Sequence, residues 1–304
     1  MSEQISIKKI AQLTGHNASI FALSASAKPR HFLSAAGDGW VVEWNLHDPE
    51  IGRLIAKVET QIFSMKLLPE QQQVVVGNMN GGVHWVDLID PEQTRNVLHH
   101  KKGVYAIERV GDWLLTLGGE GKLSRWSIAE RRSQESFQLS SQSLRAIAHA
   151  PERNELAIGA SDHNIYLLDA ETLALRKVIE GAHDNSVFTL RYQDAGRLLF
   201  SGGRDAHLKV WDTAADFANI SSQPAHWFTI NDLAFDPRGQ WLATASRDKT
   251  IKIWDAKAFK LLKVLDTARD GCHINSVNRL FWSEDGRYLI SASDDRSLIV
   301  WEIG

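Results

Sequence analysis

Histidine, aspartate and serine recur together along this chain, and these are the residue types of a hydrolase that activates a serine nucleophile. Four histidines each precede an aspartate by 22 residues and a tryptophan by 28. The sets are His16 with Asp38 and Trp44, His183 with Asp205 and Trp211, His226 with Asp248 and Trp254, and His273 with Asp295 and Trp301. An enzyme needs a catalytic triad only once, and the tryptophan of each set has no role in such a triad. Four copies at one spacing therefore predict a structural role.

Other chemical motifs are weak in this sequence. The 12 histidines lack the close spacing of metal ligands, except for His99 and His100, and adjacent residues of a strand point to opposite faces. We interpret Cys272, the single cysteine, as an ordinary loop thiol. No GxxxxGKS or GxxxxGKT phosphate loop, GxGxxG helix start or HExxH pair occurs. We therefore expect no catalytic residue, no metal and no cofactor.

Six tryptophans and one leucine mark an internal repeat. They end similar apolar runs at intervals of 41, 41, 42, 43, 43 and 47 residues, and they are Trp44, Trp85, Trp126, Leu168, Trp211, Trp254 and Trp301. A unit of about 43 residues thus occurs seven times, which is the length of one blade of a β-propeller.

Each unit contains four strand-like segments with polar turns between them. In the sixth unit the segments are TINDLAF, WLATAS, TIKIWD and KLLKVL, and DPRGQ and RDK form turns. No stretch keeps a 3.6-residue period for more than a turn or two, so we expect very little helix. The sequence predicts an all-β fold, a seven-bladed β-propeller of four-stranded antiparallel sheets.

The two ends of the chain predict how the ring closes. Between the other units, 14 to 19 residues separate the tryptophan position from the next histidine position, and they hold the outermost strand. Only three residues follow Trp301, so the seventh unit lacks that strand. Residues 1–15, with the run ISIKKIAQL, are expected to supply it. We expect one propeller domain over residues 1–304, closed by the N-terminal strand in the last blade.

These residues resemble the tryptophan–aspartate (WD-repeat) propeller family over nearly the whole chain. Gly15-His16, Trp211-Asp212 and Trp254-Asp255 match the family's Gly-His and Trp-Asp signatures. The resemblance implies a buried hydrogen-bond network of His, Ser or Thr, Asp and Trp in each blade. We expect it in full in two blades, as His226, Ser246, Asp248 and Trp254, and as His273, Ser293, Asp295 and Trp301.

The other blades depart from this pattern. Ala36 and Gly203 stand where we place the serine of the first and fifth blades. The second blade has Asn80 near the aspartate position and no histidine, while the third has His100 and Glu120 at altered spacing. The fourth has Asp162 with Ser140 and Leu168. We expect blades 2 to 4 to open more readily than blades 5 to 7.

The innermost strand of each unit begins with a candidate recognition residue, five positions after the histidine position. These residues are Phe21, Phe63, Tyr105, Arg145, Phe188, Asn231 and Asn278. Flanking apolar residues are three apart, as in Ile20 and Leu23, which predicts a β-bulge that turns the middle side chain away from the core.

The family resemblance implies that this position, with the residue before the turn aspartate, surrounds the channel on one face and contacts peptides. The latter residues include Arg204, Arg247 and Asp294. Large aromatics beside arginines are typical of binding hot spots. The alternative is that the aromatics fill the core between blades.

The composition and the net charge limit the functions that this chain is expected to have. With 43% hydrophobic and 23% charged residues, a net charge of −3 and no 18-residue apolar run, the chain is typical of a cytoplasmic protein that binds neither nucleic acid nor membrane. We predict a non-catalytic interaction scaffold that binds a protein or peptide partner on the channel-mouth face, as a monomer or as a subunit of a larger assembly. The alternative is a propeller enzyme or a small-ligand or metal binder, for which Asp232, Glu43 and Glu108 are the available acids.

Overall fold

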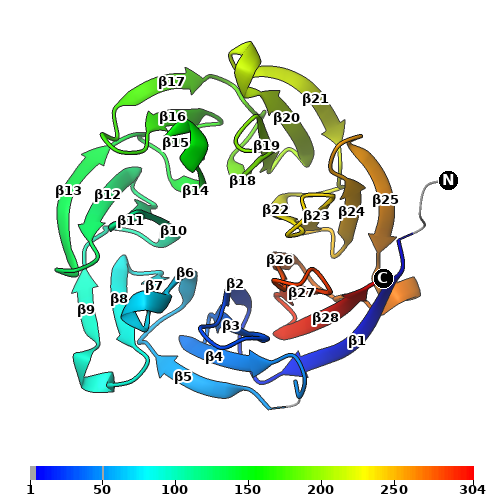
Figure 1. Cartoon of the computed structure of the whole chain (residues 1–304), viewed down its shortest axis with the longest axis horizontal. Coiled ribbons are helices and arrows are strands. Elements are labelled where there is room, and N and C mark those ends of the chain that lie inside the picture. The colour runs from blue at the N-terminus through cyan, green and yellow to red at the C-terminus, as the bar shows by residue number, and fades with distance from the viewer. Residues whose placement is uncertain (1–4, 50) are drawn as a thin grey trace.

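The computed structural model describes residues 5–49 and 51–304, and it places them in a ring of seven sheets around a central channel (Figure 1). Each sheet has four strands, and every pairing within the sheets is antiparallel. The predicted architecture, an all-β seven-bladed propeller, is confirmed.

The strands occupy four positions from the channel outward (Figure 1). The innermost strands are β2(Ile20–Ala25), β6(Ile62–Leu68), β10(Val104–Val110), β14(Leu144–Ala150), β18(Val187–Gln193), β22(Ile230–Phe235) and β26(Val277–Trp282). The second strands are β3(His31–Ala36), β7(Gln73–Asn78), β11(Trp113–Gly118), β15(Glu155–Ala160), β19(Leu198–Gly203), β23(Trp241–Ser246) and β27(Tyr288–Ser293). The third strands are β4(Trp40–Asn45), β8(Gly82–Asp87), β12(Lys122–Ser127), β16(Ile165–Asp169), β20(His207–Asp212), β24(Ile251–Asp255) and β28(Ser297–Ile303). The outer strands are β5(Arg53–Lys57), β9(Arg95–Leu98), β13(Arg132–Gln138), β17(Leu175–Ile179), β21(Ala218–Pro224), β25(Lys260–Leu265) and β1(Ile7–Thr14).

Strand β1 closes the ring, as predicted. It pairs antiparallel with β28, from Ile7 opposite Ile303 to Thr14 opposite Ser297, so the first and last segments of the chain share the seventh blade (Figure 1). Residues 1–4 of the segment that we assigned to this strand lie outside the described residues. The pairing covers the outer edge of β28, which would otherwise expose a row of unpaired backbone groups.

The hydrophobic core lies between blades rather than within them. Each of the seven buried clusters draws on two neighbouring blades, and the one at the closure joins Trp44 and Val42 of the first blade to Ile290 and Leu298 of the seventh. A single four-stranded sheet has no partner for its two faces, so the ring is the unit that buries apolar surface.

Helices are short and confined to connections within the described residues. They are α1(Thr267–Asp270) and the 3-10 turns η1(Pro69–Gln71), η2(Pro91–Gln93), η3(Pro151–Arg153) and η4(Thr213–Ala215). Helix α1 lies in the loop before His273, and Lys9 of β1 donates to the carbonyl of Gly271 just after the helix, at 2.7 Å. Cys272 of this loop is buried in a core cluster, and burial raises the pKa of its thiol to about 12.

Candidate functional site

The recurring polar residues form a closed hydrogen-bond network inside the blade, of which the seventh blade is a clear case. His273 Nδ1 lies 2.9 Å from Asp295, and its Nε2 lies 2.9 Å from the hydroxyl of Ser291. The indole N–H of Trp301 donates to the same hydroxyl, at 3.0 Å. All four side chains are buried, the Asp295 side chain being 6% exposed, and each polar group has a partner, as burial requires.

Five blades carry this complete network, with the hydroxyl residue always ten positions before the tryptophan. The sets are His16, Ser34, Asp38 and Trp44; His100, Thr116, Glu120 and Trp126; His183, Ser201, Asp205 and Trp211; His226, Thr244, Asp248 and Trp254; and His273, Ser291, Asp295 and Trp301.

Protonation states follow from the hydrogen bonds. The carboxylate needs a hydrogen on Nδ1, so a neutral ring presents Nε2 as an acceptor. The hydroxyl can then donate to Nε2 while it accepts from the indole. Burial lowers the pKa of His183 and His226, and the paired aspartate only partly opposes this shift. Burial also disfavours the Asp205 carboxylate, but hydrogen bonds led by that from His183 outweigh it and hold the pKa of Asp205 at about 2.

The assignment of Ser246 and Ser293 to the network was wrong. The hydroxyls that contact the histidine and the indole belong to Thr244 and Ser291, two residues earlier. Residues two apart in a strand share a face, so the sequence pattern allowed both choices. Ser246 instead donates to the carbonyl of Phe228 and accepts from the N–H of Asp248, which stabilises the turn.

For the same reason the first and fifth blades are complete, contrary to our prediction. Ser34 and Ser201 supply the hydroxyl, and Ala36 and Gly203 occupy a different position. A Cβ on Gly203 would lie 2.8 Å from His183 Nδ1, so this glycine leaves room for the ring.

The second and fourth blades lack the network, and the sequence shows why. At the hydroxyl position they have Val75 and Ile158. In the second blade the buried Trp85 indole nitrogen has no hydrogen-bond partner among the described residues. In the fourth blade Asp162 accepts from the hydroxyls of Ser140 and Tyr166 instead.

The predicted bulges are present at the start of all seven innermost strands, next to the channel mouth. The pairing register of each strand shifts by one residue, and the extra residue is the candidate recognition residue. We call these seven the collar: Phe21, Phe63, Tyr105, Arg145, Phe188, Asn231 and Asn278. All seven side chains are half-buried, and together they line one depression of about 340 Å³ at the channel mouth.

Blades 1 to 5 form the aromatic part of the collar. The rings of Phe21 and Phe63 meet edge to face with centroids 5.3 Å apart, and Phe63 stacks on Tyr105 at 5.5 Å. The Arg145 guanidinium lies over Tyr105 at 4.2 Å and over Phe188 at 5.3 Å. These rings contact one another, and the core clusters of the described residues do not include them.

Blades 6 and 7 form the polar part. Asn231 donates to the Val277 carbonyl at 2.8 Å, and Asn278 donates to the Ile20 carbonyl at 3.0 Å. Each amide therefore links its blade to the next one across the channel end, which fixes the collar in place.

Arg204 and Arg247 lie outside the depression, although we had grouped them with the collar. Both are exposed and follow the second strands of their blades. The lining residue that sequence reasoning missed is Arg279, directly after the bulge of β26. A signal existed: five of the seven residues at this position are small (Ala22, Ser64, Ala106, Ala146 and Thr189), and the other two are Asp232 and Arg279.

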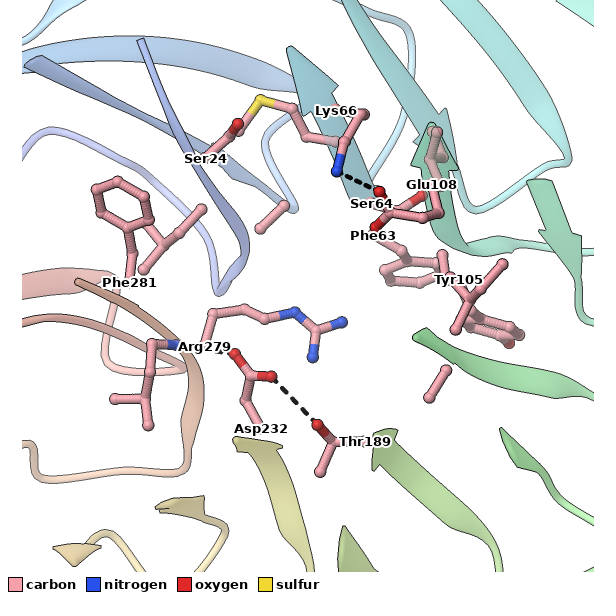
Figure 2. A pocket seen from close by; sticks show the side chains of 18 of the residues that line it. Ser24, Phe63, Ser64, Lys66, Tyr105, Glu108, Thr189, Asp232, Arg279 and Phe281 are labelled. Atoms are coloured by element: carbon pink, nitrogen blue, oxygen red, sulfur yellow. Dashed lines mark hydrogen bonds and ion pairs between the residues drawn. The ribbon is translucent and has the colours of Figure 1, made fainter. Parts of the chain in front are cut away.

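Below the collar, the channel is a second cavity of about 480 Å³, and two ion pairs, Lys66 with Glu108 and Arg191 with Asp232, are part of its lining. Figure 2 shows the Arg279 side chain extended into this space above Asp232, and Lys66 joined to Glu108. Asp232 is 2% exposed and accepts from Arg191 at 3.2 Å, from Thr189 at 3.4 Å and from the N–H of Leu280 at 3.0 Å. Burial lowers the pKa of Arg279, an effect that nearby Asp232 partly offsets.

A model of the WD domain, G-beta repeat, matches residues 7–45, 175–212, 218–255 and 259–302, together more than half of the chain. The chain belongs to the WD40 family. The matched WD40 segments cover the first and the last three blades. The third blade falls outside them although it carries the complete network, with Glu120 in place of aspartate.

Two named relatives and one solved structure are similar to this WD40 chain. The THO complex subunit 6 homolog of Danio rerio is 25% identical over 50% of this chain and 53% of its own length. Transducin beta-like protein 3 of Bos taurus is 26% identical over 66% of this chain and 21% of its own length. The chain thus matches about half or less of these relatives. The crystal structure of the WD40 β-propeller domain of Doa1 superimposes with a TM-score of 0.84 at 17% identity, over 97% of both chains, which shows the shared fold.

No helix among the described residues is long and apolar enough to cross a membrane. They also hold no group of three or more His, Cys, Asp or Glu side chains placed to bind a metal ion.

Proposed function

We propose that this protein is a non-catalytic interaction scaffold that binds a peptide segment of a protein partner at the collar. The observation that carries the proposal is the collar itself: seven bulges, one per blade, turn seven side chains into one half-buried depression. Aromatic rings and arginines that are already fixed by their neighbours lose little conformational entropy on binding.

The loops on the same face extend this surface. The loop that leads into β22 exposes Trp227 and Phe228, with 86% and 59% of their surfaces accessible. The backbone N–H of Trp227 donates to Asp248, so the polar network of the sixth blade fixes the exposed pair beside Asn231. Aromatic side chains such as these are enriched at protein interfaces. Trp40, by contrast, is half-buried and packs on a core cluster.

Membership of the WD40 family supports an interaction role, and the name of the Danio rerio relative places that protein in a complex. We propose that this chain likewise acts as a monomer or as a subunit of an assembly, in the cytoplasm and without nucleic acid.

The test is quantitative affinity isolation with collar variants. Phe188→Ala and Arg145→Ala should reduce recovery of the bound partner about tenfold, since each removes a rigid anchor. Leu98→Ala, on the exposed outer strand β9, is the matched control and should bind like the unmodified protein. Far-ultraviolet circular dichroism and melting curves establish that the variants fold. Equal recovery with all three variants would contradict the proposal.

A further inference from the structure

Two arginines and, among the described residues, no acid line the depression at the channel mouth, while the carboxylate of Asp294 accepts from the collar residue Asn278 at 2.8 Å. The two arginines are Arg145 and Arg279. The channel below is also positive, with Arg145, Arg191, Arg279 and Lys66 against Asp232 and Glu108. The whole chain has a net charge of −3, so the charge that lines the depression is opposite in sign to that of the chain as a whole.

Arg145 is held so that one edge of its guanidinium stays open. Its Nε donates to Ser161 at 3.0 Å, while Tyr105 and Phe188 cover its faces. Within the described residues, its two terminal nitrogens have no hydrogen-bond acceptor. They are the edge that a carboxylate engages through two parallel hydrogen bonds.

Arg279 is the second open donor. Its single hydrogen bond within the described residues runs from Nη1 to the Asn231 carbonyl at 3.2 Å, and no carboxylate oxygen there lies within ion-pair distance of it. The carboxylate of Asp232 already accepts from Arg191 and from the Leu280 N–H. The burial that lowers the pKa of Arg279 means that its guanidinium has lost part of its hydration, and an anion would restore the missing partners.

We infer that the channel mouth recognises an acidic peptide, with one Asp or Glu carboxylate seated between Arg145 and Arg279. This inference rests on the proposed function and names the chemistry of its ligand. The rings of Phe21, Phe63 and Tyr105, which contact one another in turn, line the same depression as the two arginines and would take an apolar side chain that flanks the acid. The arginines and the aromatic rings of the depression thus favour a peptide in which an acidic residue stands next to an apolar one.

The experiment selects the ligand and then removes each charge in turn. A random-peptide phage library is selected on the full chain, and enriched peptides are synthesised with a fluorophore. Each peptide is also made with its acid replaced by the amide, Glu→Gln or Asp→Asn, and with phosphoserine at the same position. Affinities are measured by fluorescence polarisation for the unmodified chain, Arg145→Gln, Arg279→Gln, Arg279→Lys and the control Arg132→Gln. Arg132 is exposed on the outer strand β13 and carries the same charge.

Enriched peptides should contain an acid beside an apolar residue. Arg279→Gln and the amide peptide should each weaken binding about tenfold or more, and together little more than either alone, because both break one charged hydrogen-bonded pair. The affinity of Arg279→Lys should lie between those of the unmodified chain and Arg279→Gln, because a lysine keeps the positive charge but cannot donate two parallel hydrogen bonds as a guanidinium does. Melting curves establish folding, and Arg145→Gln reports on the same site if Arg279→Gln is unstable.

Other outcomes overturn the inference. If peptides bind at the collar, and lose binding in Phe188→Ala, but ignore Arg279→Gln, Arg145→Gln and the amide replacement, the scaffold role stands and the anionic ligand is wrong. If the phosphoserine peptide alone binds, the carboxylate assignment is wrong. If the library yields no peptide that distinguishes the unmodified chain from Phe188→Ala, both proposals fail.

Discussion

At the scale of single residues, the recurring histidines, hydroxyls and tryptophans form hydrogen-bond networks inside the blades. In five blades one Ser or Thr hydroxyl serves both the histidine and the indole. That hydroxyl is therefore the residue on which two buried groups depend, and its loss should cost more than that of any hydroxyl at the turn.

A comparison of Thr244→Val with Ser246→Ala tests this difference. Thr244→Val preserves side-chain shape but leaves His226 Nε2 and Trp254 Nε1 buried without partners, so we expect it to lower the free energy of unfolding by about 2–4 kcal/mol. Ser246→Ala removes hydrogen bonds at a turn and should cost about 1 kcal/mol. Urea unfolding of both variants gives the comparison. The opposite order would show that the hydroxyl assignment from the sequence was right after all.

Stability should also depend on pH. The folded-state pKa of the buried histidines is below the unfolded value of 6.5. At a pH near or below 6.5, the unfolded chain therefore binds more protons than the folded chain. This contribution to the free energy of unfolding is complete above about pH 6.5 and is lost progressively below it. A second loss, from aspartates such as Asp205, follows between the unfolded value of 3.8 and about 2.

Urea unfolding at a series of pH values measures this dependence. His226→Gln should be less sensitive between about pH 6.5 and pH 5, because it removes one of the titrating groups. His47→Gln changes an exposed histidine and should leave the slope unchanged. A midpoint that is flat over this range in the unmodified protein would refute the neutral, buried state of the histidines.

At the scale of elements, the blades share a backbone plan but differ in internal hydrogen bonding. The apolar segments with their polar turns sufficed to predict four strands per blade, and apolar residues three apart predicted the bulge in the innermost strand. The 22-residue and 28-residue spacings located the histidine, the aspartate and the tryptophan of the network. They did not distinguish Thr244 from Ser246, because both lie on one face of β23. The spacings also did not predict the complete network of the third blade, because Glu120 lies 20 residues after His100 rather than 22.

Hydrogen–deuterium exchange should therefore rank the blades. We expect the second and fourth blades to exchange faster than the first, fifth, sixth and seventh, because Val75 and Ile158 replace the shared hydroxyl and the histidine network is missing. The third blade, which we first grouped with the weak ones, should exchange like the complete blades. Uniform protection around the ring, measured by peptide-resolved mass spectrometry, would contradict this ranking.

At the scale of the whole molecule, closure of the ring is what brings the collar together. The seven collar residues are separated by up to 257 positions in sequence, from Phe21 to Asn278, and only the circular arrangement puts them around one depression. Sequence reasoning identified all seven because the repeat gives each blade the same register. The repeat also marks the position of Arg279, where most blades have a small residue, but the direction of its side chain across the channel follows only from the structure (Figure 2).

Photo-crosslinking tests the central claim, that this face of the ring contacts the partner. The change Phe63→p-benzoylphenylalanine puts a photoreactive ring among the collar aromatics, and the same change at Leu98 on the outer strand β9 is the reference. We expect the partner to be crosslinked from position 63 and not from position 98. Crosslinks from position 98 alone would show that the partner binds the outer rim of the propeller and that the collar is not the recognition site.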